Sequence, residues 1–215
     1  LLVAPTSVVN PFWVNHWLSL VVFYFYSPSR WWDKIKNYRK LASTDHTTST
    51  RITALIPAGL LFLFLIPYLL VVQAPKLDPL LHFPHLFFGA VNIIVGVVLI
   101  ISGGTFALWS IFSQFTLANG TPLPMLPTKK LLVNGAFKYC RNPMTLGTIL
   151  AYSGVAVLVG SLSSFLFVML FFTALLCYLK FLEEKELAER FGQEYLDYKA
   201  ATPFIIPRIK KSHDR

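Results

Sequence analysis

Residues 86–111 read LFFGAVNIIVGVVLIISGGTFALWSI, and this stretch gives the clearest indication of the fold class of the chain. It contains no charged side chain and is long enough to cross a hydrocarbon core of about 30 Å as a helix. Two other apolar segments, 52–73 and 165–182, are of spanning length, and 144–160 is just long enough. A fifth candidate, 8–26, is interrupted by polar residues and a proline. We therefore predict an all-α, polytopic membrane protein with about five transmembrane helices.

The composition of the whole chain agrees with this reading. Hydrophobic residues make up 55% and charged residues 13% of the sequence, and the mean hydropathy is +0.58. These values exclude an ordinary water-soluble domain. The net charge of +9 could favour nucleic acid, but most basic residues flank the apolar blocks, where lipid headgroups explain them. We predict a bilayer environment and no nucleic-acid partner.

The loop charges predict the orientation of the spans. Lys and Arg concentrate in 30–51, in 129–141 and in the C-terminal tail, whereas 74–84 has Lys76 balanced by Asp78. Because cytosolic loops carry the excess of Lys and Arg, five spans with the N-terminus outside satisfy every loop. The C-terminal half then faces the cytosol, in the endoplasmic reticulum of a eukaryote or the inner membrane of a bacterium.

Two regions are expected along the chain. Residues 1–119 form an N-terminal transmembrane region with three spans, and residues 120–215 form a helical hairpin with a cytosolic tail. In the third span Gly89, Gly96 and Gly103 recur every seven residues, which puts them on one helix face. That face could let a neighbouring helix approach closely or leave room for a lipid tail.

Other features carry little functional signal. Cys140 and Cys177 are not placed for a structural disulfide, so both are read as free thiols. His82 and His85 have no cluster of further ligands, so no metal site is expected. The sequence begins with Leu1, so we expect its true start to be missing or processed. No pattern indicates the oligomeric state.

The first candidate for chemistry lies between the third and fourth spans, where residues 120–147 read GTPLPMLPTKKLLVNGAFKYCRNPMTLG. Pro143 suits the first position of a helix, whose free N–H groups favour an anionic ligand such as a carboxylate. The alternative is an ordinary helix start at which Arg141 extends toward the membrane surface. The segment by itself supports both interpretations.

The second candidate follows the fifth span. The spacing of apolar residues predicts one cytosolic amphipathic helix, with Leu187, Phe191, Tyr195 and Tyr198 on its apolar face. At its start stand Glu183 and Glu184. Carboxylates at a membrane exit are costly unless they are solvated or paired with a cation. These two therefore either point to water or hold a positive group.

Taken together, three ordered motifs resemble the isoprenylcysteine carboxyl methyltransferase family and its bacterial and phospholipid N-methyltransferase relatives. They are LVxGxxxxxRNPM at 132–144, EExxLxxxFGxxYxxY at 183–198 and TPFIIP at 202–207. The resemblance implies a helical membrane methyltransferase that binds S-adenosyl-L-methionine in a cytosolic pocket. It also implies a lipid-like or lipidated substrate that enters from the bilayer.

The resemblance also assigns roles by position. Glu183 would hold the ammonium group of the cofactor, and the other cofactor-binding positions are Lys129, Lys130, Leu131, Leu132, Phe137, Asn142, Pro143, Met144 and Thr145. The candidate catalytic side chains are Arg141, Lys180 and Glu184, of which Glu184 is the nearest base for an amine acceptor. The physical requirement agrees, since the zwitterionic end of the cofactor needs a carboxylate partner and N–H donors.

The sequence departs from the family pattern at three positions. Many members have His at the position of Asn142 and Tyr at that of Thr145. Leu179 stands where the isoprenylcysteine enzymes have an Arg that holds the substrate carboxylate, and the neighbouring Lys180 could take that role. These departures weaken the case for a prenylated-cysteine substrate more than the case for the cofactor.

Two other functions remain open at the level of sequence. A sterol-reductase-like membrane enzyme would use NADPH instead of S-adenosyl-L-methionine. A non-enzymatic membrane scaffold or small transporter would bind neither, and a transporter needs polar groups inside its spans. Asn92 and a few hydroxyl groups are the main polar groups inside the secure spans, so transport has little support.

Overall fold

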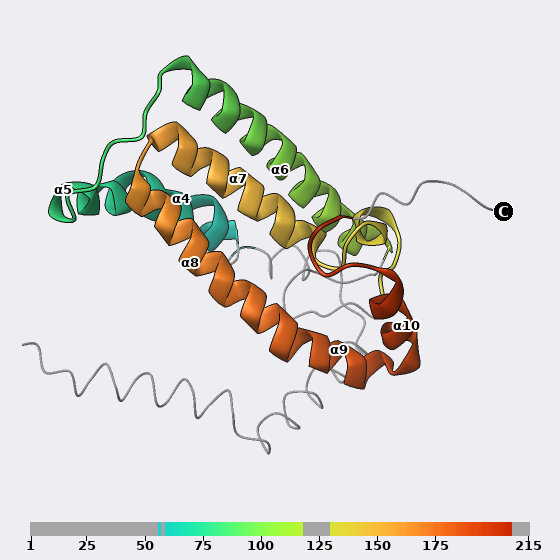
Figure 1. The fold of residues 1–215 in the computed structure, drawn as a ribbon. Coiled ribbons are helices and arrows are strands. Elements are labelled where there is room, and N and C mark those ends of the chain that lie inside the picture. The colour runs from blue at the N-terminus through green and yellow to red at the C-terminus, as the bar shows by residue number, and fades with distance from the viewer. Residues whose placement is uncertain (1–55, 57–58, 118–129, 208–215) are drawn as a thin grey trace, which may run out of the picture.

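The computed structural model describes residues 56, 59–117 and 130–207, and within these residues the chain forms helices and no strands. The predicted span at 8–26 lies outside the described residues. Figure 1 shows a bundle whose helices run alongside one another, with the last two short helices at one end. The elements of the bundle are α6 (Ala90–Leu117), α7 (Pro143–Val159), α8 (Leu162–Tyr178) and a helical segment that precedes α6.

The segment before α6 changes its helical geometry several times. Its parts are η1 (Leu61–Leu65), α4 (Ile66–Tyr68), η2 (Leu69–Gln73), η3 (Ala74–Lys76) and α5 (Leu77–Leu80). Pro67 lies inside α4 and cannot donate a backbone hydrogen bond, and wider π-helical turns flank α4 on both sides. The helix continues seven residues past the predicted end at Gln73, so much of the expected loop at 74–84 is helical.

Within the residues that the structure describes, three helical stretches are long and apolar enough to cross a membrane: Leu61–Leu80, Ala90–Leu117 and Leu162–Phe191. They overlap the three strongest predicted spans, which confirms an all-α membrane protein. Helix α7 corresponds to the predicted fourth span, shifted by one residue, and at 17 residues it is shorter than these three stretches. The third span begins at Ala90 because Gly89 has a left-handed backbone with φ +66°, a conformation that ends regular helical geometry.

After α8 the chain continues without a break through η5 (Leu179–Glu183) into α9 (Glu184–Phe191). The prediction of one amphipathic helix was wrong here, because α9 ends at Phe191 and a separate helix, α10, runs from Gln193 to Ala201. Gly192 separates them with φ +58° and ψ −131°, a conformation that an L-residue rarely adopts. The turn lets α10 fold back toward the end of α6 (Figure 1).

Glycines bring α6 and α7 into backbone contact. A Cβ added at Gly103 would lie 2.5 Å from both the backbone N of Ala151 and the carbonyl O of Gly147. One at Gly154 would lie 2.6 Å from the carbonyl O of Gly96. Low residue numbers of α6 therefore pack on high numbers of α7, and the two helices are antiparallel. Gly96 and Gly103 support the interpretation of the glycine face as a helix-packing surface. Gly89 precedes α6 and has open space around it.

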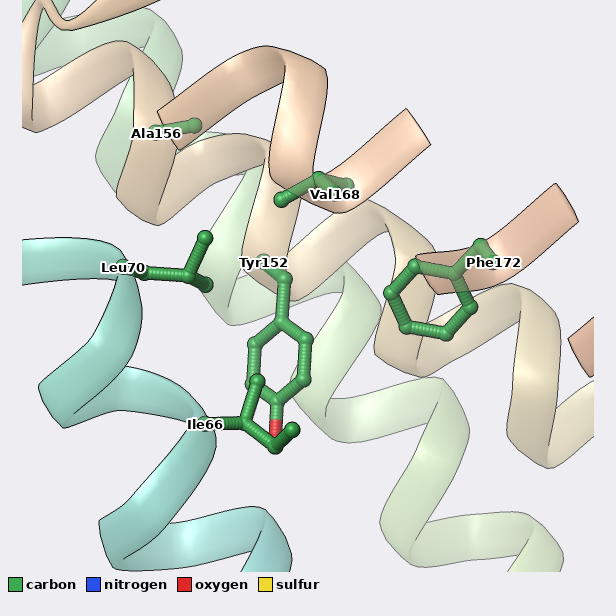
Figure 2. Packing of buried hydrophobic residues seen from close by; sticks show 6 residues of the cluster. All are labelled: Ile66, Leu70, Tyr152, Ala156, Val168 and Phe172. Carbon is green, nitrogen blue, oxygen red and sulfur yellow. The ribbon is translucent and has the colours of Figure 1, made fainter. Parts of the chain in front are cut away.

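The apolar core lies where α4, η2, α7 and α8 meet. Figure 2 shows the buried cluster, which consists of Ile66, Leu70, Tyr152, Ala156, Val168 and Phe172. The Tyr152 hydroxyl donates a hydrogen bond to the carbonyl O of Phe62, so the one polar atom of this side chain is satisfied inside the bundle. By contrast, many large apolar side chains of α6 face outward, as expected of a helix surrounded by lipid.

Buried polar side chains fix the opposite end of the bundle from α10. The Asp78 carboxylate accepts a hydrogen bond from the Ser163 backbone N–H at 2.9 Å, in the first turn of α8. The Asn92 amide donates to the carbonyl O of Leu86 at 2.9 Å and to that of Val157 at 2.7 Å. Asp78 therefore caps another helix, although the loop-charge pattern suggested that it balances Lys76.

Candidate functional site

All three predicted motifs meet at Arg141, two residues before α7 begins. Its guanidinium lies 2.5 Å from the carboxylate of Glu184, and the two side chains are 8% and 5% exposed. Its Nη1 also donates to the carbonyl O of Lys199 at 2.8 Å and to that of Thr202. We call this end of the bundle the motif end, defined by Arg141, Glu184 and Phe204.

The carboxylate of Glu184 is surrounded by cations. Oε1 accepts hydrogen bonds from Arg141, and Oε2 lies 2.9 Å from the Lys199 ammonium and 3.4 Å from that of Lys180. Three positive neighbours strongly favour the ionised carboxylate. They also place a cation beside each of its two oxygens, which leaves it poorly placed to accept a proton from a substrate.

Backbone hydrogen bonds hold the TPFIIP motif against the residues that precede α7. The N–H of Arg141 donates to the carbonyl O of Pro203 at 2.9 Å, and that of Asn142 donates to the carbonyl O of Phe204 at 3.2 Å. The Asn142 side-chain amide donates to the same Phe204 oxygen at 3.1 Å. The segment 202–207 therefore lies along the residues that lead into α7, and Figure 1 shows it returning to this end of the bundle.

The start of α7 has the predicted form. Pro143 is its first residue and is buried, and Asn142 precedes it with its carbonyl accepting from the Leu146 N–H at 3.1 Å. The first N–H groups of a helix have no partner inside the helix. Because the Asn142 side chain makes no cap, the first turn of α7 points N–H donors toward the motif end. Thr145 is buried in that turn.

The 130–142 segment contributes a small apolar cluster at the motif end. Leu132 and Phe137 form a small buried cluster, and the carbonyl O of Phe137 accepts a hydrogen bond from the Tyr198 hydroxyl at 2.7 Å. Burial, followed by the nearby Cys140, raises the pKa of Tyr198. Burial also raises the pKa of Tyr195, so both phenols remain protonated at neutral pH.

The structure brings some of the predicted site residues together and separates others. Arg141, Lys180 and Glu184, the predicted catalytic set, form one ion-pair cluster. Glu183 is half-buried one residue away, at the end of η5. Lys129 lies outside the described residues, Lys130 is exposed, and Leu131 and Met144 are half-buried.

Sequence reasoning missed two contributors to this cluster. Lys199 supplies an ammonium to Glu184, and its carbonyl O and that of Thr202 bind Arg141. The Phe204 ring lies beneath two cations, 4.9 Å from Lys180 Nζ and 5.8 Å from Arg141 Cζ. The TPFIIP motif contained the signal for Phe204, whereas Lys199 occupies a helix position that reads as a solvated surface.

A scan of family models identifies the class of this region. Residues 91–194, just under half of the chain, match the family described as phospholipid methyltransferase. The matched segment runs from α6 to α10 and includes Arg141 and Glu184. The finding confirms the resemblance to the membrane methyltransferases that the three motifs predicted. No curated protein matches the chain.

Proposed function

We propose that the chain is an S-adenosyl-L-methionine-dependent methyltransferase that acts on a lipophilic or amphiphilic substrate at the membrane surface. The observation that carries this proposal is the family match at 91–194, which spans the place where the RNPM and EE motifs form an ion pair. The apolar exterior of α6 and α8 supports a substrate that arrives through the bilayer.

The residues at the motif end fit the zwitterionic part of this cofactor. Among the described residues, Glu184 is paired with three cations, whereas Glu183 forms no ion pair. The Glu183 carboxylate is therefore available for an ammonium group. The first-turn N–H groups of α7 supply donors for a carboxylate, and Leu132 and Phe137 supply buried apolar surface in the segment before α7.

When bound, the cofactor supplies a methyl group that is already activated by its sulfonium, so the protein has mainly to align the two reactants and exclude water. In this proposal Glu183 orients the ammonium group and the start of α7 orients the carboxylate. Arg141 and Glu184 hold these two elements in register. Effects of alignment can be worth roughly 7 to 11 kcal/mol of the barrier.

Glu184 and Lys180, the other two candidate catalytic side chains, have different roles in this proposal. Glu184 fixes the position of Arg141 and α9 instead of acting as the base for an amine acceptor, because cations occupy its oxygens. The Lys180 side chain is 44% exposed and lies over the Phe204 ring, so it can meet the headgroup of the substrate. A carboxylate or thiolate acceptor needs no base at all.

Binding of S-adenosyl-L-methionine and S-adenosylhomocysteine to the detergent-purified protein, measured by calorimetry, tests this proposal. Glu183→Gln removes the charge that would hold the ammonium, so we expect it to weaken binding about tenfold or more. Glu194→Gln removes an exposed carboxylate of α10 and serves as the matched control. Binding of NADPH in place of the adenosyl ligands would support a reductase instead. A folded protein that binds neither adenosyl ligand would exclude the proposed methyltransferase.

A further inference from the structure

One polar atom near the motif end has no partner. In the part of the chain that the structure describes, the Oε1 atom of Gln114 is buried and accepts no hydrogen bond. Gln114 lies in the last turn of α6, a helix of high mean hydropathy. An unpaired acceptor in such a place costs stability unless something donates to it. It therefore indicates a missing donor.

The helical register shows where this atom lies. Gly103, Ala107, Ser110 and Gln114 follow one another at spacings of four, three and four, so they share one face of α6. Gly103 and Ala107 contact Gly147 and its neighbours on α7.

Because α6 and α7 are antiparallel, residues further along α6 pack on residues nearer the start of α7. The face that contacts Gly147 through Ala107 therefore reaches the first turn of α7 one to two helical turns further along α6. Ser110 is fully buried on this face, and its hydroxyl donates back to the carbonyl O of Phe106 at 2.7 Å. It thus gives no donor to Gln114. By this register, Gln114 faces the residues that lead into Pro143, where the proposed cofactor site begins.

The residue next to Gln114 packs on the segment that contains Phe137. The short helix η4 (Gly135–Lys138) packs on the end of α6, since a Cβ at Gly135 would lie 2.6 Å from Ser113 Oγ. The Ser113 hydroxyl already donates to the carbonyl O of Trp109 at 2.8 Å. The segment that carries Phe137 therefore packs beside Ser113, the neighbour of Gln114, and neither Ser110 nor Ser113 supplies a donor to Gln114.

We propose that Gln114 is a cofactor-binding residue whose side-chain carbonyl accepts a hydrogen bond from an N–H group of the bound nucleoside–amino-acid cofactor. The inference rests on the proposed function and names a residue that none of the three motifs includes. S-adenosyl-L-methionine offers two such donors, the amino group of its adenine and its ammonium. Both present the same chemistry to an amide oxygen.

The variants Gln114→Leu and Gln114→Glu separate binding from folding. Leu keeps the approximate volume and removes the unpaired acceptor, so the ligand-free variant should melt at the same temperature as wild type or higher. Glu retains an acceptor oxygen and should retain cofactor binding. Thr116→Val is the matched control, because Thr116 is an exposed residue two positions further along α6.

Calorimetry with three ligands completes the test. For S-adenosylhomocysteine we expect Gln114→Leu to bind about 3- to 10-fold more weakly than wild type, the usual worth of one hydrogen bond. If adenine is the donor, 5′-methylthioadenosine shows the same loss and S-inosylhomocysteine, which lacks the amino group, shows none. If the ammonium is the donor, both homocysteine ligands lose affinity and 5′-methylthioadenosine does not.

Two results would overturn the assignment of Gln114 while leaving the methyltransferase proposal intact. One is wild-type affinity for S-adenosylhomocysteine in Gln114→Leu. The other is a lower melting temperature of the ligand-free Leu variant, which would show that the side chain serves the fold. A wild-type protein that binds no adenosyl ligand overturns the proposed function itself.

Discussion

Arg141 and Glu184 are 43 residues apart in the sequence, yet their guanidinium and carboxylate groups lie 2.5 Å apart in a place shielded from solvent. The pair joins the residues before α7 to the first turn of α9. It is the direct link between the two sequence clusters that suggested a methyltransferase. Removing one partner leaves the other charge buried without its main counterion.

We therefore expect Glu184→Ala to destabilise the protein by about 3–5 kcal/mol, the usual cost of breaking a buried pair. Arg141→Lys keeps the charge but cannot reproduce the bonds to Glu184, Lys199 and Thr202. We therefore expect it to recover only part of the stability that Arg141→Ala loses. Thermal melting in detergent measures both effects. Wild-type melting temperatures in these variants would show that the pair does not organise the motif end.

The contact between α6 and α7 predicts opposite effects for two adjacent glycines. Gly103→Ala places a Cβ 2.5 Å from backbone atoms of α7, which should cost about 1–3 kcal/mol or more through forced separation of the helices. Gly104→Ala meets nothing within 4 Å and should be neutral or stabilise by up to about 1 kcal/mol. Melting curves of the two variants side by side provide the test, and equal stability would contradict the packing.

The cap at the other end of the bundle can be tested by an isosteric change. Asp78→Ala removes the acceptor of the Ser163 N–H and should destabilise the protein by about 1–2 kcal/mol, as loss of a helix cap does. Asp78→Asn keeps an oxygen in place and should recover most of this loss. If Asp78→Asn were as damaging as Asp78→Ala in detergent melting, the carboxylate would have a role other than capping.

The buried thiol of Cys140 makes stability depend on pH. Burial raises the pKa of Cys140 from 9.0 to about 11, so the unfolded chain releases this proton at a lower pH than the folded protein does. The stabilisation that the protonated Cys140 thiol gives the folded protein is therefore fully present below pH 9 and is lost as the pH rises through 11. We expect the free energy of unfolding of wild type to fall by about 1–3 kcal/mol more than that of Cys140→Ala over this interval.

Measuring both proteins at each pH removes the contribution of Tyr195, which is present in both and titrates independently of Cys140. The contribution of Tyr198 cancels only in part, because Cys140 also raises the pKa of Tyr198. Parallel curves from pH 8 to pH 11 would show that Cys140 reaches solvent in the folded state.

The spans were predictable because a helix in lipid must be apolar around its whole circumference, and this property is visible residue by residue. The ends of the spans were not, because they depend on single contacts. Asp78 reads as a loop charge in the sequence, whereas it is a buried cap for α8. Likewise, the apolar spacing continued through Gly192 although its backbone conformation ends α9.

For the candidate site, the sequence located the motifs but could not place them against one another. Arg141 was a candidate because of its position before Pro143, while its partners come from α9, α10 and the segment after α10. Lys199 could be recognised only once its distance of 2.9 Å from Glu184 was known. Gln114 carried no motif signal, since its unpaired oxygen is a property of the packed helix.

The backbone bonds from Arg141 and Asn142 to Pro203 and Phe204 also set an order of events during biosynthesis. The partners are about 62 residues apart, and chains are made from the N-terminus onward. The helices α6 and α7 are therefore synthesised before Phe204 has been translated. The motif end is completed last, so a ribosome that stalls before this residue would leave an inserted bundle without a finished site.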